Sequence, residues 1–320
     1  MPDRGLLDRE RALALHRTML LIRAFETQAS ALYKDGRLPG FIHLSIGQEA
    51  CAAGACAALE PGDWITSTHR GHGHCLAKGA DPRRMMAELF ARADGYSRGR
   101  GGSMHIADVS RGVLGANGIV GQSVPLAVGA AYSAQVRGEP SVAVAFFGEG
   151  ASSAGAVHEA MNIAALWRLP VVFFCEANGY AELTAYETHV PIESIAVRAQ
   201  GYGFPGVLVD GNDVTAVYAA VHEAAARARR GEGPTLIEAR TLRWHGHYEG
   251  DPQSYKKAAD RPGANLADPI VIFAEKLAGL GVDAAADAAA RAWAATEIEA
   301  AIAYAEASPP PTAATLLQDV

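Results

Sequence analysis

The stretch SVAVAFFGEGASSAGAVHEAMNIAALWRLPVVFFCEANGYAE, residues 141–182, has the pattern of a strand, a turn, a helix and a second strand. Its first apolar run, 142–147, has the length and the Val/Phe content of a buried parallel strand. A helix capped by Ser152 or Ser153 is predicted next, because small and apolar residues recur there at helical spacing. A second strand follows over 171–175. The unit predicts a parallel α/β sheet.

Polar loops follow both predicted strands. Gly148-Glu149-Gly150 ends the first strand, and a loop that contains Asn178 ends the second. Ligands of open parallel sheets bind beyond the carboxyl ends of the strands, and a helix N-terminus there favours phosphate. We expect Glu149 and Asn178 to face one crevice, with Glu149 as the only acid that follows a strand end within reach of Asn178. A carboxylate and an amide oxygen beside a diphosphate suit Mg²⁺.

The glycine turn alone is also typical of an ordinary strand-to-helix connection. It does not fit the GxGxxG dinucleotide fingerprint, because Ser153 stands where the third glycine belongs. It also lacks the Gly-Lys-Ser/Thr of a P-loop.

The spacing of the acidic glycine turn and Asn178 resembles the thiamine diphosphate (ThDP) fingerprint. The sequence from Gly40-Phe-Ile-His43 through His245-Gly-His247 resembles the alpha subunit of the first component of 2-oxo acid dehydrogenase complexes, in particular the acetoin dehydrogenases. The resemblance extends over about residues 12–310. Two positions differ from the family pattern: Glu149 replaces the usual Asp, and Ala177 replaces the first Asn of the usual pair.

The resemblance implies a set of site residues. The implied Mg²⁺ ligands are Glu149, Asn178 and the backbone carbonyl of Tyr180. The implied ThDP contacts are His43, His69, Arg70, Gly118, Val120, Gly150, Ala151 and His247. Arg70 offers a bidentate fork for phosphate. His247 aligns with a loop histidine that faces the cofactor and the incoming carrier, which implies a catalytic role.

Some of these residues have ordinary structural interpretations too. His43 can be a satisfied histidine before a helix, and Gly118 can belong to a helix-packing turn. His69, His72 and His74 could together suggest a metal site, but their glycine-rich spacing suits an anion-binding loop better.

The family implies cleavage of a C–C bond next to a carbonyl, in acetoin or a small 2-oxo acid, and transfer of the acyl unit to a lipoyl-bearing acyltransferase. It also implies that a separate beta subunit in an α₂β₂ assembly supplies the activating glutamate. Glu49 is the internal candidate for that role, but its apolar helix favours a structural one. The alternatives are a ThDP lyase or acyltransferase without a lipoyl partner, and a non-catalytic scaffold with a decayed site.

Alternating strand and helix patterns predict an α/β fold with a doubly wound, mostly parallel sheet. We expect one domain over residues 1–320, with helical extensions at 1–40 and 265–320. Further helices are predicted at 7–35, 81–94, 124–135, 214–229, 269–279 and 285–306, and further strands at 64–68, 206–210 and 235–240. The glycine-rich stretch 98–105 and the polar stretch 248–264 are expected to be irregular, the latter mobile without a ligand.

Composition narrows the function. The 320 residues carry a net charge of −7 and no basic patch, which argues against a nucleic-acid partner. The four cysteines have no CxxC spacing, so we expect reduced, intracellular thiols. A charged N-terminus and no apolar run of about 18 residues predict a cytoplasmic protein without a membrane segment.

Overall fold

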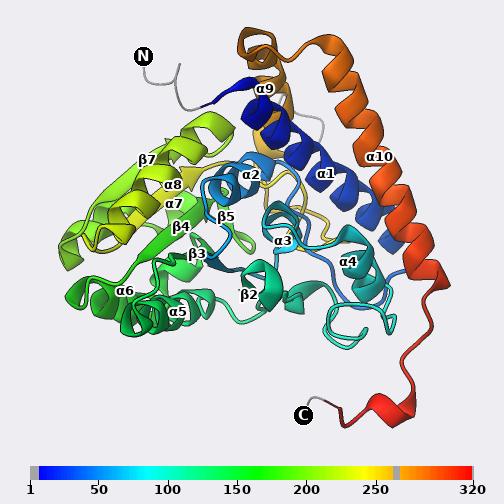
Figure 1. Ribbon diagram of the computed structural model, residues 1–320, viewed down its shortest axis with the longest axis horizontal. Helices are drawn as coiled ribbons and strands as arrows, with labels where there is room; N and C mark the ends of the chain where they lie inside the picture. The colour runs from blue at the N-terminus through cyan, green and yellow to red at the C-terminus, as the bar shows by residue number, and fades with distance from the viewer. Residues whose placement is uncertain (1–6, 262–266, 319–320) are drawn as a thin grey trace.

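The computed structural model describes residues 7–261 and 267–318. Its main feature is a six-stranded sheet in the order β2-β1-β3-β4-β8-β7, in which every neighbouring pair is parallel (Figure 1). The strands are β1 Trp64–Thr66, β2 Val113–Gly115, β3 Ala143–Gly148, β4 Val171–Ala177, β7 Gly206–Asp210 and β8 Thr235–Arg240. A two-stranded hairpin, β5 Tyr180–Ala181 and β6 Thr184–Ala185, follows β4. The predicted doubly wound α/β fold is confirmed.

Helices cover both faces of the sheet. The α-helices are α1 Arg9–Lys34, α2 Glu49–Ala57, α3 His72–Ala77, α4 Pro82–Leu89, α5 Ser123–Arg137, α6 Gly155–Leu166, α7 Tyr186–His189, α8 Val214–Arg229, α9 Pro269–Leu277 and α10 Ala284–Ala307. Short 3₁₀ helices occupy Ser103–His105, Val109–Arg111, Ala151–Ser153, Ile195–Tyr202, Ala258–Asp260, Ala278–Leu280 and Ala313–Thr315.

The two central strands bury both of their faces. Phe146 and Phe174 pack into the cluster that includes residues of α2 and α8, whereas Phe147 and Phe173 pack into the cluster built with α5 and α6. Successive side chains of a strand point to opposite faces, so a strand buried on both sides consists mostly of apolar residues. The apolar runs 142–147 and 171–175 are uninterrupted because both faces of these strands are buried.

The terminal helices pack on one another. α1 contacts α10, α2 and α9, and Figure 1 shows α1 and α10 side by side at one end of the molecule. Apolar residues of α1, α9 and α10 form a cluster that includes Leu15, Phe273 and Ala294. The predicted helices at both ends of the chain are therefore present.

Several local predictions were wrong. β1 ends at Thr66 rather than at residue 68. α6 begins at Gly155 and has no side-chain cap, because Ser152 lies in a 3₁₀ turn and donates its hydroxyl to the carbonyl of Glu149 at 2.6 Å. α4 ends at Leu89 rather than near 94, and Ala91 takes a left-handed backbone with φ of 54°.

The four cysteines are free and buried, which agrees with the expectation of thiols that form no disulfide. No helix in the described ranges is long and apolar enough to cross a membrane.

Candidate active site

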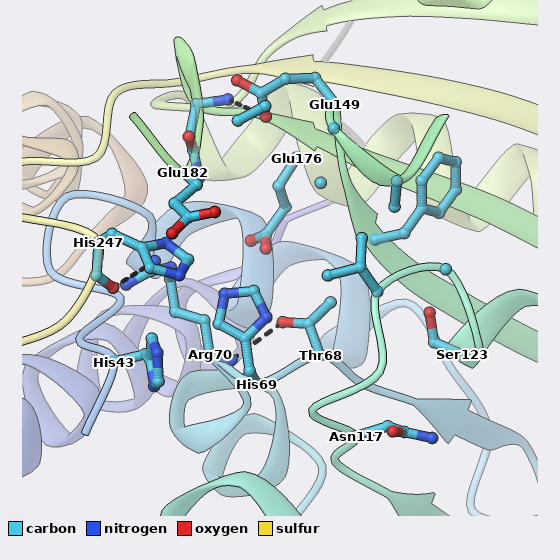
Figure 2. A pocket seen from close by; sticks show the side chains of 18 of the residues that line it. His43, Thr68, His69, Arg70, Asn117, Ser123, Glu149, Glu176, Glu182 and His247 are labelled. Carbon is cyan, nitrogen blue, oxygen red and sulfur yellow. Dashed lines mark hydrogen bonds between the residues drawn. The ribbon is translucent and has the colours of Figure 1, made fainter. Parts of the chain in front are cut away.

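A cavity of about 340 Å³ lies at the carboxyl ends of β1, β3 and β4. The chain runs outward from β1 to β2, returns to β3 beside β1, and then continues outward on the other side to β4. Ligands of doubly wound sheets bind at such a reversal of strand order. Figure 2 shows the side chains that point into this cavity from the loops after these strands and from the segment after β8.

Glu149 follows β3 directly and lines the cavity, where the residue is 1% exposed. Its Oε2 accepts the backbone N–H of Asn178 at 3.2 Å, while its buried Oε1 has no hydrogen-bond partner among the described residues. Burial raises the pKa of this carboxyl to about 7. A cation in the cavity would give Oε1 its missing partner and favour the ionised form. The acid therefore fits a divalent metal.

Asn178 is held from both ends of its amide. Its Nδ2 donates to Gln48 Oε1 at 3.1 Å, and its Oδ1 accepts the backbone N–H of Tyr180 at 3.4 Å. The Tyr180 hydroxyl donates to Asp260 at 2.7 Å, which links Tyr180 to the polar segment after β8. Glu149, Asn178 and Tyr180 line one cavity and could hold Mg²⁺ together. Sequence reasoning missed Gln48, because only the tertiary structure brings the start of α2 to Asn178.

A second acid stands close by. β4 runs two residues past its predicted end, and Glu176 pairs with Gly148 in the parallel register. Its carboxylate lies 3.2 Å from His74 Nε2 and lines the cavity. The expectation that Glu149 is the only acid within reach of Asn178 is therefore wrong. Composition did not reveal how far β4 continues, which is what brings Glu176 to the crevice.

Three imidazoles form one wall of the cavity. The ring centroids of His43, His69 and His247 lie 4.8, 5.1 and 5.3 Å from one another. Burial and the neighbouring Arg70 lower the pKa of these rings to about 3, about 2 and about 4, respectively. Nδ1 of His43 and of His247 is buried without a partner in the described structure. The wall is thus uncharged at neutral pH, and it offers ring nitrogens to a polar ligand.

Arg70 connects the two backbone segments that carry His43 and His247. Its Nη1 donates to the carbonyl of Leu44 at 2.6 Å, and its Nη2 donates to the carbonyl of His247 at 3.0 Å. The guanidinium of Arg70, which was predicted to bind phosphate, therefore already donates one hydrogen bond from each terminal nitrogen to the backbone. Each terminal nitrogen still carries a second N–H, so Arg70 could contact a phosphate while it holds the two segments together.

The segment after β8 is fixed by a buried lysine and an aspartate. Lys256, 2% exposed, donates from Nζ to the carbonyls of residues 243–245 at 2.6, 3.0 and 2.8 Å. Asp251 accepts the backbone N–H of His247 at 2.6 Å. Residues 248–261 thus have internal hydrogen bonds in the stretch 248–264 for which we expect mobility without a ligand. Residues 262–264 lie outside the described residues.

The predicted glycine and small-residue contacts also reach the cavity. Gly118 and Val120 lie on its rim, where Val120 is 60% exposed, and Gly150 and Ala151 form the turn beside Glu149. A Cβ on Gly150 would lie 2.8 Å from the Ala181 side chain, so this turn needs glycine for the hairpin to pack on it.

His72 and His74 do not join this site as metal ligands. Both lie in α3, which begins where the glycine-rich loop was expected to continue. His72 Nδ1 lies 3.0 Å from Glu26, and His74 Nδ1 lies 2.8 Å from the Ser67 hydroxyl. Across the described part of the chain, no three His, Cys, Asp or Glu side chains are grouped to hold a metal.

Fold and site together define a class: a doubly wound α/β subunit that binds a polar cofactor at the switch point of its sheet. Residues 17–314 match the model of the family described as "Dehydrogenase E1 component". The chain is 49% identical over 317 residues to the alpha subunit of acetoin:2,6-dichlorophenolindophenol oxidoreductase from Bacillus subtilis, covering 98% of this chain and 94% of that one. It is 46% identical to the Cupriavidus necator protein of the same name, covering 98% and 95%.

A pyruvate dehydrogenase E1 alpha subunit from Zymomonas mobilis is 44% identical, with 80% of this chain and 73% of that one covered. The chain belongs to the dehydrogenase E1 component family. Members of this family use ThDP with a divalent metal, typically Mg²⁺, which confirms the cofactor prediction. The orphaned Oε1 of Glu149 and the unpartnered ring nitrogens of the histidine wall fit such a group.

Proposed function

We propose that this chain is the alpha subunit of an acetoin-cleaving dehydrogenase. With a beta subunit it would form a cytoplasmic α₂β₂ assembly that breaks the C–C bond next to the acetoin carbonyl and passes the acyl unit to a lipoyl-bearing acyltransferase. The buried Oε1 of Glu149, left without a donor beside Asn178, is the observation that carries the cofactor role. The choice of acetoin rests on the names of two relatives that match almost the whole chain.

ThDP, when bound, supplies the electron sink that such a cleavage needs. In this proposal Glu149, Asn178 and the carbonyl of Tyr180 bind the Mg²⁺ that neutralises the diphosphate. Gln48 orients Asn178 in this site by accepting its Nδ2–H at 3.1 Å.

The histidine wall and Arg70 bind the same end of the cofactor. Because the three rings are neutral, each can donate one N–H or accept one hydrogen bond without adding charge. Arg70 supplies the positive charge and keeps the two segments that carry His43 and His247 in place. His247 stands on the segment after β8 and would also face the incoming acyl carrier.

A second chain would have to complete the site. The cavity rim includes Ile119 and Val120, which are 66% and 60% exposed. The nearest internal candidate, Glu49, is 0% exposed and accepts the backbone N–H of Gly47 at 3.0 Å. A carboxylate engaged in this way favours a structural role, so we assign the activating glutamate to the beta subunit.

The test is reconstitution. The chain should show no ThDP-dependent acetoin cleavage alone, and should gain it with its beta subunit when an artificial electron acceptor is present. Acyl transfer to a lipoyl domain distinguishes a dehydrogenase component from a lyase that has no lipoyl partner. Failure of the reconstituted pair to bind ThDP with Mg²⁺ in a calorimeter would favour the non-catalytic scaffold.

A further inference from the structure

Glu182 is a cavity residue that neither the metal site nor the histidine wall uses. It lines the cavity, and Figure 2 shows its carboxylate directed toward His247 and His69, on the same side as Glu176. Its carboxylate has no hydrogen bond or ion pair to any residue in the described ranges, whereas Glu176 is engaged by His74 at 3.2 Å. One negative charge is thus presented to whatever enters the cavity.

The backbone of Glu182 is unusual for a glutamate. Glu182 and Leu183 form the two-residue turn between β5 and β6, and Glu182 has φ of 53°. A first turn residue with positive φ is usually glycine, because a side chain is strained there. Strained backbone of this kind gathers at functional sites, where the surrounding structure enforces it.

Two contacts enforce this position. Arg243, 1% exposed, donates from Nη2 to the carbonyl of Glu182 at 2.8 Å. On the other side, the Ala181 side chain packs closely on Gly150: a Cβ added to Gly150 would lie 2.8 Å from the Ala181 Cβ. The turn is therefore clamped between the segment after β8 and the glycine turn after β3, which holds Glu182 at the cavity.

None of the described cations near Glu182 pairs directly with its carboxylate. The nearby imidazoles are uncharged at neutral pH, and both terminal nitrogens of Arg70 donate to backbone carbonyls. Arg243 uses Nε for the carbonyl of His245 at 3.3 Å and Nη2 for the carbonyl of Glu182 and the hydroxyl of Tyr255, both at 2.8 Å. A substrate carboxylate next to Glu182 would meet a like charge that no ion pair of the described residues engages.

We propose that Glu182 is a specificity-determining residue that selects an uncharged hydroxyketone substrate and rejects 2-oxo acids, whose carboxylate it repels. This inference rests on the proposed function, since it concerns the substrate of the same cavity. An uncharged substrate with a hydroxyl beside its carbonyl can instead donate that hydroxyl to the carboxylate. The rejection of anions is an electrostatic effect, so it should disappear when the charge is removed while the shape of the side chain is kept.

The experiment compares two pyruvate analogues that cannot lose CO₂ and that differ by one charge, methyl acetylphosphonate (a monoanion) and the uncharged dimethyl acetylphosphonate. Each is titrated calorimetrically into the reconstituted alpha–beta enzyme with ThDP and Mg²⁺, for the wild type, Glu182→Gln, and Glu193→Gln as the control. Glu193 is an exposed acid that does not line the cavity. We expect the ratio of the two dissociation constants to shift toward the monoanion by about tenfold or more in Glu182→Gln and to stay unchanged in Glu193→Gln.

A second readout is turnover. Glu182→Gln should raise kcat/KM for pyruvate relative to acetoin by a similar factor. An unchanged ratio of dissociation constants, or an equal loss of both ligands, would overturn the proposal, because the carboxylate would then not discriminate by charge. If the wild-type enzyme failed to cleave acetoin, the proposed function would fall, while the two titrations would still show whether Glu182 repels anions.

Discussion

The environment of Glu149 explains how single residues set the chemistry of this cavity. Its carbonyl accepts the Ser152 hydroxyl at 2.6 Å, so the chain after it is drawn into a 3₁₀ turn, and one carboxylate oxygen is held by Asn178 at 3.2 Å. The other carboxylate oxygen, Oε1, has no hydrogen-bond partner among the described residues. A residue with one satisfied and one orphaned oxygen, both buried, is arranged to bind a cation rather than to stabilise the apo chain.

We therefore expect Glu149→Ala to abolish Mg²⁺-dependent ThDP retention. The dissociation constant of ThDP, measured by calorimetry on the reconstituted enzyme, should rise by at least about tenfold, because the diphosphate loses its compensating metal. Glu159→Ala, which removes an exposed acid from α6, should leave it unchanged. Unchanged ThDP affinity in Glu149→Ala would refute the metal assignment.

The histidine wall predicts acid sensitivity. His69 has its pKa lowered to about 2 by burial and by Arg70, so the folded state holds this ring neutral. Its contribution to stability is complete above the unfolded pKa of about 6.5 and is lost as the pH falls below it. Between pH 7.5 and pH 5 the wild type should lose about 1–2 kcal/mol of unfolding free energy that His69→Gln does not lose. Denaturant titrations at the two pH values measure it; equal losses in both proteins would contradict the prediction.

At the scale of elements, two buried charges order segments that lack regular structure. Glu88, 0% exposed in α4, accepts the backbone N–H groups of residues 97, 99, 101 and 102 at 2.8, 2.9, 2.8 and 2.9 Å. Lys256 is the corresponding donor: its Nζ donates to the carbonyls of residues 243–245. Irregular backbone can be as fixed as a strand when one charged group satisfies several of its polar atoms.

Glu88→Gln should loosen the glycine-rich segment 97–102. Glutamine keeps the shape but offers one acceptor oxygen in place of two, which leaves backbone N–H groups unsatisfied and costs about 2–4 kcal/mol of unfolding free energy. Hydrogen exchange at residues 97–102 should accelerate. Glu275→Gln on the exposed side of α9 is the matched control. Unaltered exchange in Glu88→Gln would show that the glycines are held by other contacts.

Lys256→Met should disorder the segment that carries His247. Three carbonyls lose their shared donor, so we expect faster hydrogen exchange over 243–256 and weaker ThDP binding. The neighbouring Lys257, which is exposed and pairs with Glu187, gives the control variant Lys257→Met. If both variants behaved alike, the three hydrogen bonds of Lys256 would not be what positions His247.

At the scale of the whole molecule, an apolar surface is left open by the residues that the structure describes. Exposed apolar side chains gather on α5 and α6, which cover one face of the sheet (Figure 1). They are Leu126, Tyr132, Val136, Ile163, Leu166 and Trp167. Exposed apolar patches of this kind mark protein interfaces. We infer that this face contacts another subunit of the proposed assembly.

Leu166→Glu should therefore weaken assembly without unfolding the chain. Leu166 is 73% exposed, so a glutamate there costs little in the isolated subunit but would bury a charge in the interface. Analytical ultracentrifugation of the alpha–beta mixture should show dissociation, with an unchanged melting temperature for the chain alone. Leu317→Glu, at an 82% exposed position in the C-terminal segment, is the control. Normal assembly of Leu166→Glu would place the interface elsewhere.

The sequence alone determined the central strands, most of the long helices and the edge of the sheet at which the cavity lies. β7, β8 and α8 begin and end at the predicted residues, because buried strands and amphipathic helices have distinct periods in sequence. Glu149 and Asn178 could be assigned to one crevice because parallel strands place their carboxyl ends at one edge of the sheet.

Only the tertiary structure decided the partners of these residues. Gln48 reaches Asn178, Glu88 orders 97–102, and Glu182 turns into the cavity on a backbone that favours glycine. Each of these arrangements depends on the three-dimensional packing of segments, or on a backbone angle that the neighbouring contacts impose. Periodicity and spacing describe a segment by itself, so they contain no information about which distant group will satisfy a buried polar atom.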